Sequence, residues 1–113
     1  MPKIRLCALS DIDENQSKGF SPEGEPLQQL FIVRRDGQYF AYLNQCPHTG
    51  ATLNWQDHQF LDIDNQYIQC AVHGALFRVH DGYCLRGPCA NQRLSSVSIE
   101  ILDNDIYWLK SHT

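Results

Sequence analysis

The chain has 113 residues, of which 42% are hydrophobic and 19% are charged, and this suits one small domain with a modest core. Nine basic and thirteen acidic residues give a net charge of -4 without any basic cluster, so nucleic acid is not an expected partner. No apolar run approaches the length of a membrane span, and the N-terminal residues lack the apolar stretch of a signal peptide. We therefore expect a single domain, residues 1–113, in the cytoplasm.

Short strands dominate the predicted secondary structure, and no window of helical length has a clean 3.6-residue period. In chain order, the predicted strands cover residues 4–8, 30–34, 38–43, 60–63, 66–70, 76–79, 97–101 and 106–109. Residues 11–27 are polar and rich in turn formers, which predicts a surface loop. Turn dipeptides separate the later strands, at Asp36-Gly37, Asp64-Asn65, Asp81-Gly82 and Asp103-Asn104. This spacing predicts an all-β barrel or sandwich.

Two Cys/His pairs stand in or beside the loops between these strands. Five cysteines and five histidines are present, and four of them form the pattern C-x-H-x21-C-x2-H, with Cys46-Pro47-His48 followed by Cys70-Ala71-Val72-His73. Two thiolates with two imidazoles suit zinc or an iron–sulfur centre. In a [2Fe–2S] cluster, two neutral imidazoles in place of two thiolates remove negative charge and raise the reduction potential.

With these motifs the sequence resembles the Rieske [2Fe–2S] family, and specifically its small ferredoxin-type members, from about residue 30 to residue 109. The resemblance is carried by Cys46-Pro47-His48-Thr49-Gly50, Cys70-Ala71-Val72-His73-Gly74 and Gly87-Pro88. It implies an antiparallel β-sandwich or barrel that holds one [2Fe–2S] cluster in loops at one tip. It further implies that Cys46 and Cys70 hold the buried iron, that His48 and His73 hold the outer iron, and that a loop at Gly87-Pro88 covers the cluster.

Four positions depart from the Rieske proteins of respiratory complexes. Ala51 and Val72 replace two further cysteines that form a disulfide beside the cluster in those proteins. Ala75 and Phe77 replace a serine and a tyrosine that donate hydrogen bonds to the cluster sulfurs. Because such donors stabilise the reduced cluster, their absence predicts a potential at the negative end of the Rieske range of roughly −150 to +300 mV.

The remaining cysteines, histidines and aromatic residues are assigned structural roles. Cys7 is expected to pack as a small hydrophobic residue. Cys84 and Cys89 are expected to be reduced thiols beside the covering loop, with a disulfide between them as the alternative. Three histidines are expected at the surface: His58, His80 and His112. Four aromatic residues are expected in the core or around the cluster: Trp55, Phe60, Tyr67 and Phe77. A longer loop is expected around residues 55–64.

The expected function is electron transfer rather than catalysis. The protein would accept one electron from a reductase and pass it to an oxygenase or other redox enzyme, so its partners would be redox proteins. Neither G-x-G-x-x-G nor a P-loop is present, and no small-molecule substrate site is evident. Two alternatives remain: an accessory subunit resembling the small subunit of nitrite reductase, and a binding module that uses the same four residues to hold zinc. The acidic balance is a weak argument for steering toward a basic patch on a partner.

Overall fold

The computed structural model describes residues 3–24, 26–47, 50–54, 56–71, 74–89 and 91–109. Within these ranges the secondary structure comprises strands and one short 3-10 helix, η1 (Leu9–Asp11). The predicted all-β class is therefore confirmed. None of the described segments forms a helix with the length and apolar character that a membrane crossing requires.

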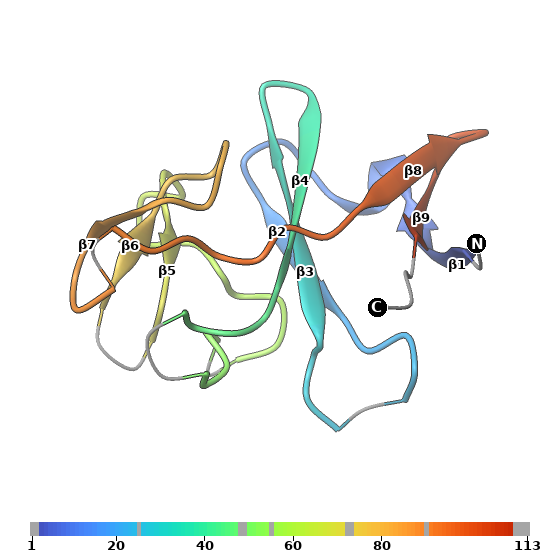
Figure 1. Ribbon diagram of the computed structural model, residues 1–113. Helices are drawn as coiled ribbons and strands as arrows, with labels where there is room; N and C mark the ends of the chain where they lie inside the picture. Colours follow the sequence, from blue (N-terminus) through green and yellow to red (C-terminus); the bar gives the residue numbers. More distant parts are fainter. Residues whose placement is uncertain are drawn as a thin grey trace.

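The strands form three antiparallel sheets of three strands each, and Figure 1 shows the second sheet between the other two. The first sheet has the order β1-β9-β8, with bounds Lys3–Ala8, Asp105–Leu109 and Ile99–Leu102. The second has the order β2-β3-β4, with bounds Ser17–Phe20, Leu30–Arg35 and Gln38–Leu43. The third has the order β5-β6-β7, with bounds Ile68–Gln69, Leu76–Phe77 and Cys84–Arg86.

The middle sheet is buried on both faces, because alternate side chains of β3 enter two different hydrophobic clusters. Leu30 and Ile32 pack into a cluster with residues of β1 and β9. Phe31 and Val33 pack into a second cluster with residues of β5, β6 and β7. Successive side chains of a strand point to opposite faces, so one strand joins both cores. We call the part built on the second cluster the ligand-loop half and the part built on the first cluster the terminal half.

One strand lies where the sequence predicted only a loop. β2 falls within residues 11–27 and pairs with β3, with Gly19 opposite Phe31. A Cβ atom at Gly19 would come within 2.9 Å of the Phe60 ring, so glycine permits the close approach of β2 to the core. The strand is short and polar in sequence, and it forms through pairing with a distant neighbour.

The predicted strand at residues 60–63 is reduced to one bridge, between Leu61 and Ile68. The side chain of Asp62 explains the early end, because its Oδ1 accepts hydrogen bonds from the N–H groups of Gln66 and Tyr67 at 2.8 and 3.2 Å. Asn65 has a φ of 57° and donates its N–H to the Asp62 carbonyl at 2.9 Å. The predicted turn is therefore present, but tight, and little of the chain before it pairs as a strand.

Candidate metal centre

The segment that begins at Cys46 is a tight loop closed by two backbone hydrogen bonds. The N–H of Cys46 donates to the carbonyl of Ala51 at 2.8 Å, and the N–H of Gly50 donates back to the carbonyl of Cys46 at 2.7 Å. Gly50 has a φ of 78°, a conformation that favours glycine. Two residues separate the loop from the end of β4 at Leu43, so the middle sheet fixes where the loop begins.

The segment that begins at Cys70 repeats this pattern between β5 and β6. The N–H of Cys70 donates to the carbonyl of Ala75 at 2.9 Å, and the N–H of Gly74 donates to the carbonyl of Cys70 at 2.8 Å. Gly74 has a φ of 68°. Both loops thus place a cysteine at the first position, close five residues later, and use a left-handed glycine at the fifth position. We call residues 46–51 and 70–75 the first and second ligand loops.

The structure brings the two cysteines of the motif into one core. Cys46 is 3% exposed and Cys70 is fully buried, and both belong to the hydrophobic cluster of the ligand-loop half. The two histidines of the motif, His48 and His73, lie outside the described residues. Two buried cysteines at equivalent positions of matching loops can supply the two thiolate ligands of one cluster iron.

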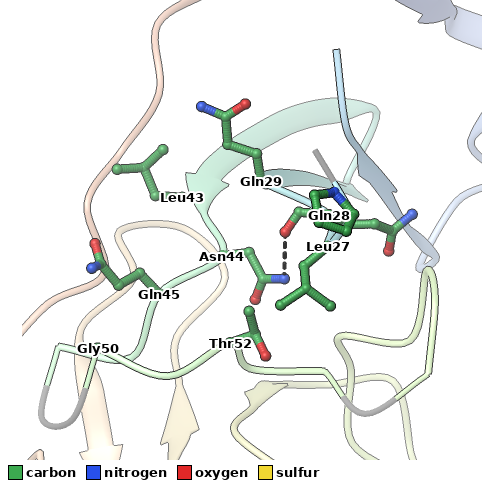
Figure 2. Close-up of a pocket in the computed structure, with 9 residues that line it drawn as sticks. Leu27, Gln28, Gln29, Leu43, Asn44, Gln45, Gly50 and Thr52 are labelled. Atoms are coloured by element: carbon green, nitrogen blue, oxygen red, sulfur yellow. Dashed lines mark hydrogen bonds between the residues drawn. The ribbon is translucent and has the colours of Figure 1, made fainter. Parts of the chain in front are cut away.

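Asn44 links the chain on either side of the first ligand loop to the second ligand loop, a role that no sequence motif indicates. Its Oδ1 accepts the N–H of Leu53 at 2.7 Å, and the carbonyl of Leu53 accepts the N–H of Ala71 at 2.8 Å. Its Nδ2 donates to the carbonyl of Gln28 at 2.8 Å, a bond that Figure 2 shows as a dashed line. Asn44 is only 6% exposed. A polar residue two positions before Cys46, at the end of a buried strand, was the signal available in the sequence.

A pocket of about 410 Å³ lies against the first ligand loop. Figure 2 shows its lining, with Leu27 and Gln28 on one side, Gln45 and Gly50 on the other, and Thr52 between them, below Asn44. The residues that line it contribute amide, hydroxyl and aliphatic groups and no acid, base or thiol. The described residues of the lining therefore offer no group for acid–base or nucleophilic chemistry.

The segment around Gly87 packs directly on the second ligand loop. A Cβ atom at Gly87 would lie 2.9 Å from both Cα and Cβ of Ala75, and Gly87 has a φ of 111°. Glycine is required here by conformation and by contact. This agrees with the covering loop that the family resemblance implies at Gly87-Pro88.

Cys84 and Cys89 form a disulfide that spans this segment, which corrects the expectation of two reduced thiols. Their Cα atoms are 5.9 Å apart, within the range that a disulfide bridges. β7 ends at Arg86 and the chain then turns at Gly87, which returns Cys89 toward Cys84. The expectation of reduced thiols rested on the redox conditions of the cytoplasm and did not include this turn, which brings the two cysteines together. The bond fixes both ends of the covering segment.

Several structural expectations for the other residues are confirmed. Cys7 is buried in the terminal half, and burial raises the pKa of its thiol to about 11, so it remains protonated and packs as a hydrophobic residue. Phe60 and Phe77 are buried in the core, and the Phe60 ring stacks on Phe31 with centroids 4.2 Å apart. Tyr67 is half-buried and belongs to neither hydrophobic cluster, so it does not meet the expectation of core packing. Trp55 lies outside the described residues.

The three histidines expected at the surface have different outcomes. His80 is exposed and lies edge-on to the Phe40 ring, with centroids 5.1 Å apart. His58 is exposed but fixed in place: its Nδ1 accepts the N–H of Gly19 at 3.1 Å, and its backbone N–H donates to Oε1 of Gln28 at 2.9 Å. The predicted long loop is thereby attached to β2. His112 lies outside the described residues.

The model of the Rieske [2Fe-2S] domain matches residues 3–108. This chain belongs to the Rieske [2Fe–2S] family. It is 24% identical over 107 residues to the 3-phenylpropionate/cinnamic acid dioxygenase ferredoxin subunit of Photorhabdus laumondii, covering 95% of this chain and 93% of that protein.

Two solved structures share the fold. The ferredoxin of carbazole 1,9a-dioxygenase from Nocardioides aromaticivorans has a TM-score of 0.74 and 19% identity, covering 98% of this chain and all of the other. A ferredoxin in a complex of reduced oxygenase and oxidized ferredoxin in carbazole 1,9a-dioxygenase has a TM-score of 0.71 and 24% identity, covering 94% of this chain and 91% of the other. The predicted fold is confirmed.

The residues of the two ligand loops fit the family's cofactor, a [2Fe–2S] cluster. Buried sulfur donors at Cys46 and Cys70 match an iron that takes two thiolates. The surrounding core is apolar, with Phe31, Leu53 and Phe77 fully buried in the same cluster. A dry, low-dielectric shell of this kind controls solvent access to a cluster and adjusts its potential.

Proposed function

We propose that this protein is a one-electron carrier that holds its [2Fe–2S] cluster through Cys46, His48, Cys70 and His73. The bound cluster supplies a single reversible electron. In this proposal the protein accepts that electron from a reductase in the cytoplasm and delivers it to an oxygenase or to another redox enzyme. The whole chain, residues 1–113, acts as one cluster-binding domain.

One observation carries the proposal: the two ligand loops repeat the same backbone pattern around two buried cysteines. In each loop a cysteine N–H donates to the carbonyl five residues ahead, and a glycine N–H donates back to the cysteine carbonyl. Each loop also contains one histidine between its cysteine and its glycine, at position 48 or 73. Paired loops of equal length supply two thiolates from equivalent positions and one imidazole each, the two kinds of ligand that a Rieske cluster takes.

The protein's own residues would exclude water from the cluster and hold the loops around it in position. The buried core around Cys46 and Cys70 keeps water from the thiolates. The contact of Gly87 with Ala75 and the disulfide between Cys84 and Cys89 fix the covering segment over the second ligand loop. No catalytic group is needed for this work, which agrees with the electron carriers among the relatives, where a separate oxygenase is named.

The test is to measure iron, acid-labile sulfide and zinc in the purified protein together with its electron paramagnetic resonance spectrum after reduction. Two irons and two sulfides per chain with a Rieske-type spectrum are expected. Cys46→Ala and Cys70→Ala should each lose iron, and His48→Cys or His73→Cys should lower the potential of any cluster retained, because a thiolate adds negative charge. A colourless protein with one zinc would contradict the proposal.

Copurification separates the carrier from an accessory subunit. A carrier should be isolated alone, with its cluster, and should react reversibly with a reductase. An accessory subunit should instead be isolated in a stable complex with a large catalytic chain.

A further inference from the structure

The acidic residues are excluded from the chain segments that form the ligand loops. Residues 38–56, 65–80 and 82–99 contain no aspartate or glutamate, although the whole chain has thirteen acidic residues and a net charge of -4. These three segments include both ligand loops and the covering segment at Gly87. They contain three basic residues, Arg78, Arg86 and Arg93. The formal charge of these three segments is therefore positive, opposite in sign to that of the whole chain.

Arg86 lies beside the second ligand loop. It pairs with Leu76 across the β6–β7 ladder, one residue from the end of that loop, and it directly precedes Gly87, which packs on Ala75. Its side chain is exposed. No carboxylate among the described residues forms an ion pair with it within 4.0 Å.

Arg93 lies beside the first ligand loop. It lines a cleft of about 260 Å³ together with Gln45, Cys46, Pro47 and Gly50. Arg93 is exposed, and its guanidinium lies over the Tyr83 ring, 5.7 Å from the ring centroid. A guanidinium over an aromatic face keeps its full charge and its hydrogen-bond donors.

The four acidic residues of the ligand-loop half do not neutralise these two arginines. Asp81 accepts two hydrogen bonds from Arg78, at 2.9 and 2.6 Å, which lower its pKa to about 2, and Arg93 contributes only a weaker attraction. Asp62 and Asp64 lie in the turn before β5, at the opposite end of β5 from Cys70. Asp57 lies in the exposed turn that the neighbouring His58 ties to β2.

We propose that the surface that carries Arg86 and Arg93, beside the described parts of the two ligand loops, docks an acidic patch on the redox partner, with each arginine receiving a carboxylate. This inference rests on the proposed function and names the chemistry of its partner. Guanidinium groups recognise carboxylates through paired hydrogen bonds, and complementary charge raises the rate of encounter. The acidic residues elsewhere on the chain then disfavour docking through other faces.

Hexacyanoferrate(III) and tris(2,2′-bipyridine)cobalt(III) are the probes, because they carry opposite charges and each accepts one electron. In stopped-flow mixing, the reduced protein gives one electron to hexacyanoferrate(III), which becomes hexacyanoferrate(II), with no bond or proton exchanged. A basic face predicts that this rate falls as salt is added, despite the net charge of -4. The cobalt complex should show the reverse dependence.

The double variant Arg86→Gln/Arg93→Gln should slow the reaction with hexacyanoferrate(III) by about threefold to tenfold at low ionic strength and should speed the reaction with the cobalt complex. The matched control is Lys3→Gln/Arg5→Gln, which removes the same number of charges from β1 in the terminal half. A peptide of ten glutamates should compete with hexacyanoferrate(III) and slow it, and a peptide of ten lysines should not.

Each outcome decides the inference. A rate with hexacyanoferrate(III) that rises with salt, or a control as slow as the double variant, overturns the basic docking face and leaves electron transfer intact. A purified protein without iron and sulfide overturns the proposed function, and the docking inference with it. Loss of competition by the glutamate peptide in the double variant, with the control unchanged, would support both.

Discussion

The ligand-loop half and the terminal half are stabilised in different ways. In the terminal half, β1 and β9 are six and five residues long and pair along most of their length around buried Ile106 and Trp108. In the ligand-loop half, β5 and β6 have only two residues each, and backbone hydrogen bonds close the two ligand loops. A core with so little strand pairing gains much of its stability from the metal cluster that its loops bind. We therefore expect the terminal half to stay folded when the [2Fe–2S] cluster is lost, whereas the folding of the ligand-loop half should depend on that cluster.

The largest effect is expected from Cys70→Ala. It removes a buried ligand, so we expect loss of iron and sulfide and a large loss of protection from amide hydrogen exchange in residues 68–86, because cluster binding is coupled to folding there. Protection in β1, β8 and β9 should change less. Cys7→Ala is the matched control, since it removes a buried cysteine from the terminal half. Full iron in Cys70→Ala would show that the ligand assignment is wrong.

Ile106→Ala tests whether a change in the terminal half leaves the ligand-loop half unaffected. Ile106 is fully buried on β9, so truncation should lower the free energy of unfolding by about 2–5 kcal/mol through lost burial and an unfilled cavity. The spectrum of the reduced cluster should stay unchanged, because the residue packs only in the cluster of the terminal half. Denaturant unfolding and electron paramagnetic resonance measure the two effects. An altered cluster spectrum would mean that the two halves are strongly coupled through β3.

Asn44→Ala should affect both stability and the cluster. The variant leaves the N–H of Leu53 without its buried acceptor, a loss of about 1–3 kcal/mol. Because Leu53 in turn holds Ala71, next to Cys70, we also expect a changed electron paramagnetic resonance spectrum and faster loss of iron to a chelator. Asn54→Ala is the control, since Asn54 bonds to Asn44 but not to Leu53. If stability alone changes, Asn44 supports the fold without positioning the loops.

The sequence was sufficient to predict the elements that depend on local chemistry. Asp36-Gly37 and Asp103-Asn104 form the predicted turns because all four residues adopt positive φ, as the hairpin requires. The two Cys/His motifs also singled out Cys46 and Cys70, which the structure buries in one hydrophobic cluster. Features that depend on distant partners were missed. β2 forms only against β3, and the disulfide between Cys84 and Cys89 depends on the turn of the covering segment. Asn44 has no motif of its own, and its role exists only once Leu53 and Ala71 are adjacent.

The smallest effect, and the most specific to electron transfer, is expected from Phe77→Tyr. Phe77 is fully buried at the position where respiratory relatives have a tyrosine that donates to the cluster sulfurs. A hydroxyl that makes this bond should raise the potential by on the order of 50 mV, because about 1 kcal/mol of extra stabilisation of the reduced state corresponds to that shift for one electron. Redox titration measures it.

Phe60→Tyr is the control for this substitution, because it adds a hydroxyl to another fully buried ring of the same core. Without a sulfur acceptor, that hydroxyl should lower stability by about 1–3 kcal/mol and leave the potential unchanged. If Phe77→Tyr behaves in the same way, its hydroxyl does not reach a cluster sulfur, and the negative potential expected here has a cause other than the missing donor. A raised potential with retained stability would instead show that the hydroxyl added by Phe77→Tyr donates to a cluster sulfur without rearrangement of the ligand-loop half.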